Sequence, residues 1–150
     1  MGVIVVGIDH SKGAKAALRF ALEEARLRQA TLRVVHAWQF GYIGATGLEG
    51  WLPAAGGELD DFRQRTAAAL DETLQEVAAD TDGVTIERRP EQGTPAEVLI
   101  EESRRADLLV VGSRGHGGFA QLLLGSVSQQ CAQHASCPVV IVRGTSANGK

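Results

Sequence analysis

Runs of consecutive apolar residues alternate along the chain with stretches in which apolar residues recur every three or four positions. Residues 1–9 are a nearly continuous Val and Ile run, which is typical of a strand buried on both faces of a parallel sheet. Residues 12–29 carry Ala and Leu at helical spacing with Arg and Glu between them, which predicts an amphipathic helix. Ser11 offers this helix a capping oxygen. Residues 31–37 return to strand character.

An interruption follows at residues 38–57, where aromatic residues and six glycines obey no period. We expect a flexible loop there, because long irregular segments in compact domains are usually mobile or functional. Two interpretations stay open for Tyr42 and Trp51 in this loop: a lid over a ligand, or a partly collapsed segment. Residues 58–79 predict a helix that ends at Asp82-Gly83. Its inward stripe comprises Leu59, Phe62, Leu70, Leu74 and Val77.

Strand and helix signals then alternate to the end of the chain. Residues 84–88 alternate apolar and polar side chains, as an edge strand does, and Thr94 and Pro95 cap and begin a helix. The remaining elements are a strand over residues 108–111, a helix over 126–134 and a strand over 139–142. Such alternation implies right-handed crossovers. The prediction is an α/β fold with a doubly wound, five-stranded parallel sheet and helices on both faces.

Composition narrows the class of protein. The 150 residues, 44% hydrophobic and 22% charged, suit a single domain over residues 1–150 with a polar tail at 144–150. The longest apolar runs are far shorter than the ~20 residues that span a bilayer, and no leader segment is recognisable, so we expect a cytoplasmic protein without a membrane partner. The net charge of −3, without a basic block, argues against nucleic-acid binding.

The two cysteines point to no redox or metal chemistry. Cys131 and Cys137 are expected to be reduced and partly buried, since two cysteines without a secretion signal make no disulfide framework. His134 and Cys137 have a spacing found among metal sites, but two ligands do not complete a zinc shell of four.

The glycines near the C-terminus carry the candidate chemistry. Gly112 and Gly115 follow an apolar strand, and nine residues later Gly125 and Ser126 open a helix. Each glycine alone could simply mark the end of a helix or strand. Together they place backbone N–H groups that no side chain covers, and a hydroxyl, at a helix N-terminus. Such an arrangement is suited to binding phosphate. The sequence therefore predicts a nucleoside triphosphate site.

At this point the chain resembles the universal stress protein family, whose ATP-binding branch has Gly, two residues, Gly, nine residues, then Gly and Ser or Thr. The resemblance extends from the first strand, through Gly93-Thr94-Pro95-Ala96-Glu97, to Cys137-Pro138-Val139-Val140-Ile141-Val142. It implies a Rossmann-like sheet with strand order 3-2-1-4-5. In such a sheet the ligand lies beyond the carboxyl ends of the first and fourth strands, where the order reverses.

The resemblance also implies the ligand and its contacts. ATP is expected to bind with its base near Asp9 and the second strand, and Mg²⁺ is expected to be carried by the phosphates rather than by protein ligands. The implied binding residues are Gly7, Ile8, Asp9, His36, Ala37, Val111, Gly112, Arg114, Gly115, His116, Gly125, Ser126 and Val127. His10 stands where many family members have glycine, which alters the approach to the base.

Plainer roles stay open for several of these residues. Ser126 and Asp9 could serve only as helix caps. Arg114 and His116 could be solvated loop residues rather than phosphate contacts. His36 is interpreted as a core histidine that contributes only its backbone.

The resemblance favours a nucleotide-binding regulatory module of the stress response over an enzyme, because no nucleophile with its base, Gly-Lys-Ser/Thr loop or kinase motif is present. The alternatives are a slow Mg-dependent ATPase and a phosphate-free interaction protein of the same fold. The apolar strand at residues 139–142 has no covering element after it, and exposed edges invite pairing. We expect a homodimer through Val139 to Val142, with a further protein partner that is unknown.

Overall fold

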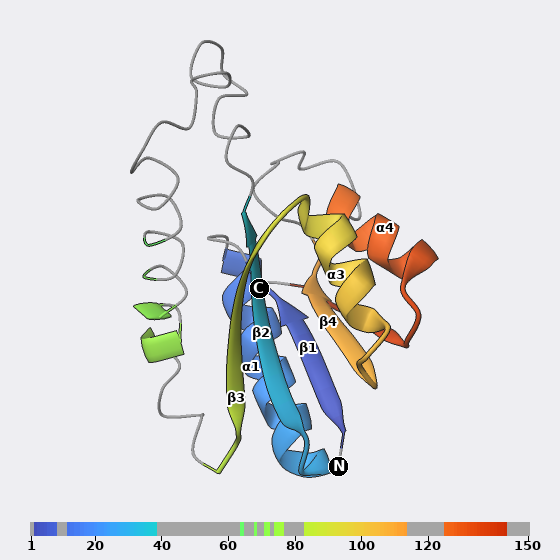
Figure 1. The fold of residues 1–150 in the computed structure, drawn as a ribbon. Coiled ribbons are helices and arrows are strands. Elements are labelled where there is room, and N and C mark those ends of the chain that lie inside the picture. Colours follow the sequence, from blue (N-terminus) through green and yellow to red (C-terminus); the bar gives the residue numbers. More distant parts are fainter. Residues whose placement is uncertain are drawn as a thin grey trace.

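A five-stranded parallel sheet forms the centre of the molecule, with strand order β3-β2-β1-β4-β5 (Figure 1). The structure is a computed structural model of the chain. It describes residues 2–8, 12–38, 64, 68, 71–72, 74–76, 83–113 and 125–143. The predicted doubly wound sheet and its strand order are both confirmed.

The two central strands are β1 (Val3–Gly7) and β4 (Leu108–Gly112). They pair in parallel, with Val6 opposite Val110, and the interior residues of both strands are buried. Continuous apolar sequence is what such a position requires, because helices cover both faces of the sheet. The first strand is shorter than the predicted run over residues 1–9, and the fourth extends one residue beyond its predicted end.

The outer strands are β2 (Thr31–Trp38), β3 (Ile86–Gln92) and β5 (Val139–Val142). The edge position predicted for β3 is confirmed, but its bounds differ from the predicted residues 84–88. Pairing with β2, from Ile86 opposite Leu32 to Gln92 opposite Trp38, carries β3 further along the chain. Pro90 fits within it because an edge strand has one side free of ladder bonds. Trp38 belongs to β2 and not to the loop predicted after it.

Helix α1 (Lys12–Arg28) covers one face of the sheet. Its apolar stripe packs against the side chains of β1, β2 and β4 that point to this face, including Ile4, Val34 and Val110. The stripe comprises Ala14, Ala17, Leu18, Ala21, Leu22 and Ala25. The helix ends before Gln29, which has a positive φ of 55°, as residues that terminate helices often do.

Helices α3 (Pro95–Ser103) and α4 (Ser126–His134) cover the other face (Figure 1). They meet the opposite side chains of the strands in a second core cluster. Thr94 is the N-cap residue of α3, as predicted, with extended backbone, but its side chain makes no capping hydrogen bond. The predicted bounds of α4 are confirmed.

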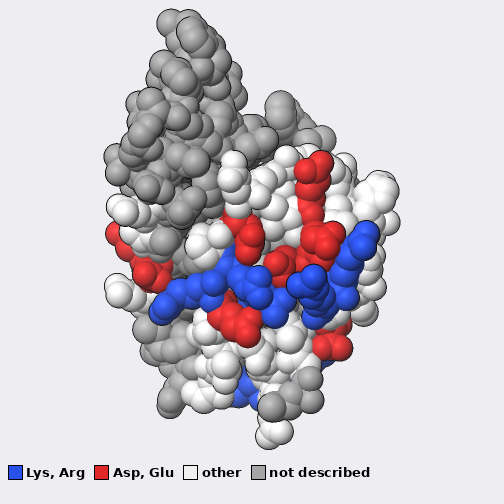
Figure 2. Space-filling view, in the orientation of Figure 1, with Lys and Arg blue, Asp and Glu red and all other residues white. Residues whose placement is uncertain are grey.

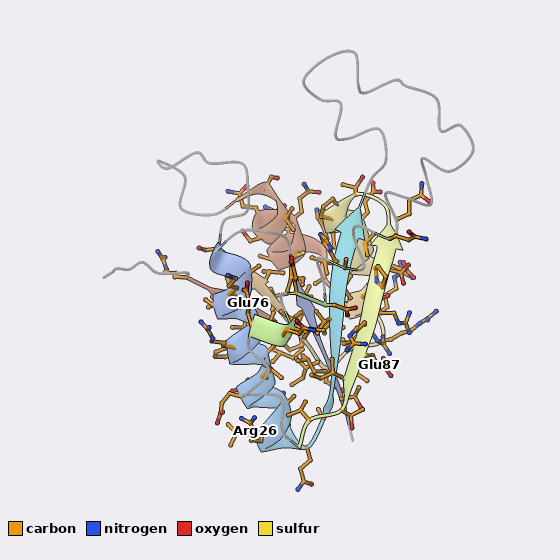
Figure 3. The ribbon with its side chains drawn as sticks, turned by 90° about the vertical axis from the view of Figure 1, so that its left-hand side faces the viewer. Arg26, Glu76 and Glu87 are labelled. Atoms are coloured by element: carbon orange, nitrogen blue, oxygen red, sulfur yellow. The ribbon has the colours of Figure 1, made fainter. Side chains whose placement is uncertain are left out.

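All described residues of the predicted helix 58–79 are helical. Leu74 is buried in the α1-side cluster, as its place in the inward stripe predicted. Glu76 lies beside α1 (Figure 3), and its Oε1 is 2.6 Å from the Nζ of Lys15. The other stripe residues, the cap Ser11 and the loop at 39–57 lie outside the described residues. Within the described part of the chain, no helix is both long and apolar enough to cross a membrane.

Arg33 of β2 lies on the α3 side of the sheet and is nearly enclosed. Its guanidinium donates to Glu87 of β3 (2.9 Å) and to Glu102 of α3 (3.0 Å). Burial alone lowers the pKa of Arg33, but the hydrogen bonds and the attraction of these two carboxylates outweigh it and raise the pKa. Figure 2 shows this side of the molecule, where a band of basic side chains is bordered by acidic ones. The mixed band agrees with the absence of a basic block in the sequence.

Candidate functional site

The sheet reverses its winding between β1 and β4. The chain runs from β1 outward to β2 and β3 on one side, and through β4 to β5 on the other. Gly7 ends β1 and Gly112 ends β4, so two predicted site residues lie at the carboxyl ends of adjacent strands. This edge is where open α/β sheets bind their ligands. The side chains of Ile8 and Val111 are buried in opposite core clusters, so these two residues could reach a ligand only through their backbone.

The end of β4 is joined to β5 and to α4 through Ser113. Its N–H donates to the carbonyl of Val142 (2.8 Å), and its carbonyl accepts from the N–H of Gly125 (2.6 Å). The hydroxyl of Ser128 lies 2.9 Å from the same carbonyl. The ends of the segment between residues 113 and 125 are therefore held together, which brings the end of β4 and the start of α4 close to each other.

Helix α4 begins at this junction without a side-chain cap. Gly125 is its N-cap, with φ −75° and ψ 170°, and no side-chain capping bond is made. Ser126 is the first helical residue and is exposed, so the interpretation of Ser126 as a cap is wrong. No described residue accepts a hydrogen bond from the N–H of Ser126 or Val127. N–H groups in the first turn of a helix have no partner within the helix and lie at the positive end of its dipole.

Gly112 is favoured here by the close packing of two backbones. A β-carbon on Gly112 would lie 3.2 Å from the carbonyl oxygen of Gly13 and 3.3 Å from its carbonyl carbon. The first turn of α1 therefore lies against the end of β4. Sequence reasoning missed Gly13, and its only signal was a glycine in the first turn of a helix that otherwise favours Ala and Leu.

Gly7 has a different neighbour. A β-carbon there would lie 2.6 Å from a terminal methyl carbon of Leu99 in α3. Packing under α3 therefore accounts for this glycine, and a contact between its backbone and a ligand remains a prediction.

Strand β2 extends past the end of β1. The carbonyl of Val35 accepts from the N–H of Ile8 (3.0 Å), and the N–H of Thr31 donates to Gly2, so the odd-numbered residues of β2 turn their backbone groups toward β1. Even-numbered Leu32 instead donates to Thr85, on the β3 side. Because strand backbones alternate in this way, the N–H and C=O of Ala37 face the space beyond the described end of β1.

His36 is placed differently from Ala37. Its backbone groups turn toward β3, where Pro90 is its register partner. Its side chain is buried, with 8% of its surface exposed, which agrees with the interpretation of His36 as a core histidine. Of the two residues predicted to bind a base through the second strand, the register directs the backbone groups of Ala37, and not those of His36, toward the β1 side of β2.

Four predicted binding residues lie outside the described residues: Asp9, Arg114, Gly115 and His116. The same holds for His10, Tyr42 and Trp51. Their proposed roles stay predictions.

Both cysteines are free thiols near the far end of α4. Cys131 is fully buried, and burial, with a smaller contribution from Cys137, raises its pKa to about 11. Burial, and then the charge of Asp107, also raises the pKa of Cys137. High pKa values keep thiols protonated and unreactive. In the part of the chain that the structure describes, no group of three or more His, Cys, Asp or Glu side chains is placed to hold a metal ion.

These features define a doubly wound, Rossmann-like α/β protein whose switch point lies between two strand-terminal glycines. The family model described as the universal stress protein family matches residues 1–143. The chain belongs to the universal stress protein family.

Relatives and solved structures agree with this membership. A universal stress protein of Mycolicibacterium smegmatis is 37% identical over 140 residues, which are 93% of this chain and 45% of the relative. The chain thus spans about half the length of that relative. YxiE, a universal stress protein of Bacillus subtilis, is 32% identical over 93% of this chain and 97% of its own length.

Two solved structures share the fold. The universal stress protein UspA from Lactobacillus plantarum superposes with a TM-score of 0.75 at 23% identity, covering 95% of this chain and 97% of its own. A universal stress protein in complex with cAMP superposes with a TM-score of 0.66 at 30% identity, covering 94% of this chain and 95% of its own.

Proposed function

We propose that this chain is an ATP-binding module of the stress response, in which Mg²⁺ accompanies the nucleotide on its phosphates. One observation carries the proposal: the uncapped first turn of α4 is tied to the end of β4 at the switch point, through the bond from Gly125 to Ser113. Backbone donors there face the edge of the sheet at which an anionic ligand would lie. The cAMP complex of the related protein supports an adenine nucleotide as the ligand.

The affinity cannot come from the helix terminus alone. Such a terminus contributes about 0.3 to 1 kcal/mol to a charged partner at an exposed site, whereas micromolar binding needs roughly 8 kcal/mol. The remainder has to come from several backbone hydrogen bonds and from burial of the base. We assign the base to the space beside Ala37, where β2 extends past the described end of β1 and the backbone groups of Ala37 turn toward the β1 side. Asp9, which follows β1, is proposed to contact the same part of the ligand.

The phosphates are proposed to lie over the N–H groups of Ser126 and Val127, with Gly112 and Gly115 leaving room for their approach. Ser126 is exposed on the first turn of α4, so its hydroxyl is free of a capping role and suits a phosphate oxygen. Arg114 and His116 are proposed as further phosphate contacts. Mg²⁺ would neutralise charge on the bound phosphates without protein ligands of its own.

Thermal unfolding with added nucleotides tests the proposal. Protein freed of co-purified nucleotide is compared with Mg-ATP, ADP, AMP, cAMP and NAD. A ligand at 100 times its dissociation constant adds about 2.7 kcal/mol to the free energy of unfolding, so ATP should raise the unfolding temperature clearly. Stabilisation by cAMP and not by ATP would show that the protein binds the cyclic nucleotide in preference to ATP. No stabilisation by any of the nucleotides would reject the binding function and leave the phosphate-free interaction protein.

A slow ATPase is the second candidate, favoured by the exposed hydroxyl of Ser126 among the donors of the first turn of α4. Bound metal and these donors could modestly stabilise the transition state of hydrolysis. Single-turnover hydrolysis of Mg-ATP, with Ser126→Ala as the control, separates the two functions. The non-catalytic module predicts turnover far below about 1 per second, the lower end of typical enzyme values. Turnover at that rate, lost in Ser126→Ala, would establish the enzyme instead.

A further inference from the structure

Ser128, the third residue of α4, carries a buried hydroxyl at the proposed phosphate site. Only 2% of its surface is exposed. Its Oγ is 2.9 Å from the carbonyl oxygen of Ser113 and 3.0 Å from that of Gly125. A serine hydroxyl has one proton to donate, so the two carbonyls share it. A buried hydroxyl in this place is costly unless it is bonded, and here it is bonded to both sides of one junction.

The two bonds differ in what they hold. The bond to Gly125 reaches back three residues within the first turn, as helical serines commonly do. The bond to Ser113 spans fifteen residues and joins α4 to the end of β4. The same carbonyl of Ser113 also accepts from the N–H of Gly125, so strand and helix are connected at two points of the first turn.

The strand side of this junction is itself immobilised. The N–H of Ser113 is bonded to Val142 of β5, and Gly112 lies against the backbone of Gly13 in α1. The bonds from Ser128 and Gly125 therefore fix the first turn of α4 to a point that two further elements hold in place. Hydrogen bonds weaken steeply when distance or angle departs from the ideal, so donors aimed at phosphate need such support.

We infer that Ser128 is a positioning residue of the nucleotide site, an inference that rests on the proposed function. Its hydroxyl does not touch the ligand, because it is buried and its proton is directed to main-chain carbonyls. It acts through the N–H groups of Ser126 and Val127, which it holds at a set distance from Gly112. Ser128 therefore affects how tightly the phosphates bind and leaves binding of the base unchanged.

Ser103 provides a matched control within the chain. It too is a buried serine, 1% exposed, whose hydroxyl donates to the carbonyl three residues earlier, that of Ile100. Its second bond, from the N–H of Ser136, joins the end of α3 to the turn before β5, away from the switch point. Loss of Ser103 removes comparable interactions without altering the first turn of α4.

Titration calorimetry with Mg-ATP and with adenosine tests the inference on wild type, Ser128→Ala, Ser128→Thr and Ser103→Ala. Loss of one hydrogen bond predicts an ATP affinity about 3- to 10-fold weaker in Ser128→Ala, with adenosine binding unchanged. Ser128→Thr retains the hydroxyl and should restore ATP affinity, and Ser103→Ala should bind both ligands as wild type does. If Ser128→Ala does not fold, Ser128→Cys, which has only a weak donor, takes its place with the same expected loss.

The outcomes separate the inference from the proposed function. Wild-type protein that binds neither ligand overturns the proposed function and the inference with it. Wild-type binding that Ser128→Ala retains in full overturns the inference alone. An equal loss for ATP and adenosine, or an equal loss in Ser103→Ala, also overturns it, since either result would indicate a general effect on the fold.

Discussion

Gly112 determines how closely α1 approaches β4. A side chain there would meet the backbone of Gly13, which cannot rotate away as a side chain could. The pKa of Cys131 likewise depends on its surroundings, because the thiol is buried in the second core cluster, between the sheet and helices α3 and α4. At this scale, the property of each residue depends on neighbours that are distant in the sequence.

Gly112→Ala should destabilise the protein by about 1 to 3 kcal/mol, as overpacking of a close contact does. It should also weaken ATP binding at least tenfold, about 1.4 kcal/mol, because relief of the contact moves α1 or the end of β4. Urea unfolding and calorimetry measure the two effects. Gly83→Ala is the control: it places a side chain at a φ of +81° before β3, which costs roughly 1 to 2 kcal/mol, and it should leave ATP affinity intact. ATP binding by Gly112→Ala at wild-type strength would contradict the prediction.

Because Cys131 is buried, we expect the free energy of unfolding to fall at alkaline pH. Its thiol has a pKa of about 11 in the folded protein and 9.0 as its ordinary value. Below pH 9 the thiol is protonated in both states, and its contribution is fully present. As the pH rises from 9 to 11 only the unfolded thiol ionises, so about 2 to 3 kcal/mol of stability is lost. Urea unfolding at several pH values checks this against Cys131→Ala, which should lose less over that interval. Parallel pH profiles for the two proteins would show that the thiol has no such role.

Helix α3 is joined to β2 by charge as well as by apolar packing. Glu102 faces inward to Arg33, and their side chains are only 14% and 11% exposed. Glu101, one position earlier, faces outward to Arg104 in an exposed pair at 3.5 Å. Two adjacent glutamates thus form ion pairs with arginine, one nearly buried and the other exposed to solvent.

Glu102→Ala should lower the free energy of unfolding by about 1.5 to 3 kcal/mol, because it removes a charged hydrogen bond from a buried guanidinium. Glu101→Ala should change it by no more than about 0.5 kcal/mol, as exposed ion pairs contribute little. Urea unfolding of the two variants measures the difference. Equal effects would mean that solvent screens the Arg33 cluster as fully as the surface pair.

At the scale of the whole molecule, the two edges of the sheet differ. The β3 edge carries charged residues and Pro90, which discourage pairing. The β5 edge consists of Val139–Val142, all partly exposed, with two of these residues against each core cluster. Of the two edges as the described residues form them, we expect the apolar β5 edge to pair with another strand.

We expect two copies of the chain to associate along β5. Light scattering at micromolar concentration should give about 32 kDa, which is twice the monomer mass of 15.9 kDa. Arg88→Ala, on the β3 edge, should leave this mass unchanged. A mass of 15.9 kDa for wild type would reject the association.

The sequence by itself determined the elements, their alternation and the glycines at the ends of strands, because these depend on local periodicity and backbone preference. The bounds of α4 and β5, the edge place of β3 and the burial of Leu74 all followed from such patterns. Strand order, and with it the switch point between β1 and β4, was expected only through a family resemblance. Tertiary structure alone decided that Gly13 meets Gly112, that Ser128 reaches Ser113 and that the backbone of Ala37 rather than that of His36 turns toward β1. These pairings depend on strand register and on how closely helices pack, which join residues too far apart for any local pattern to relate.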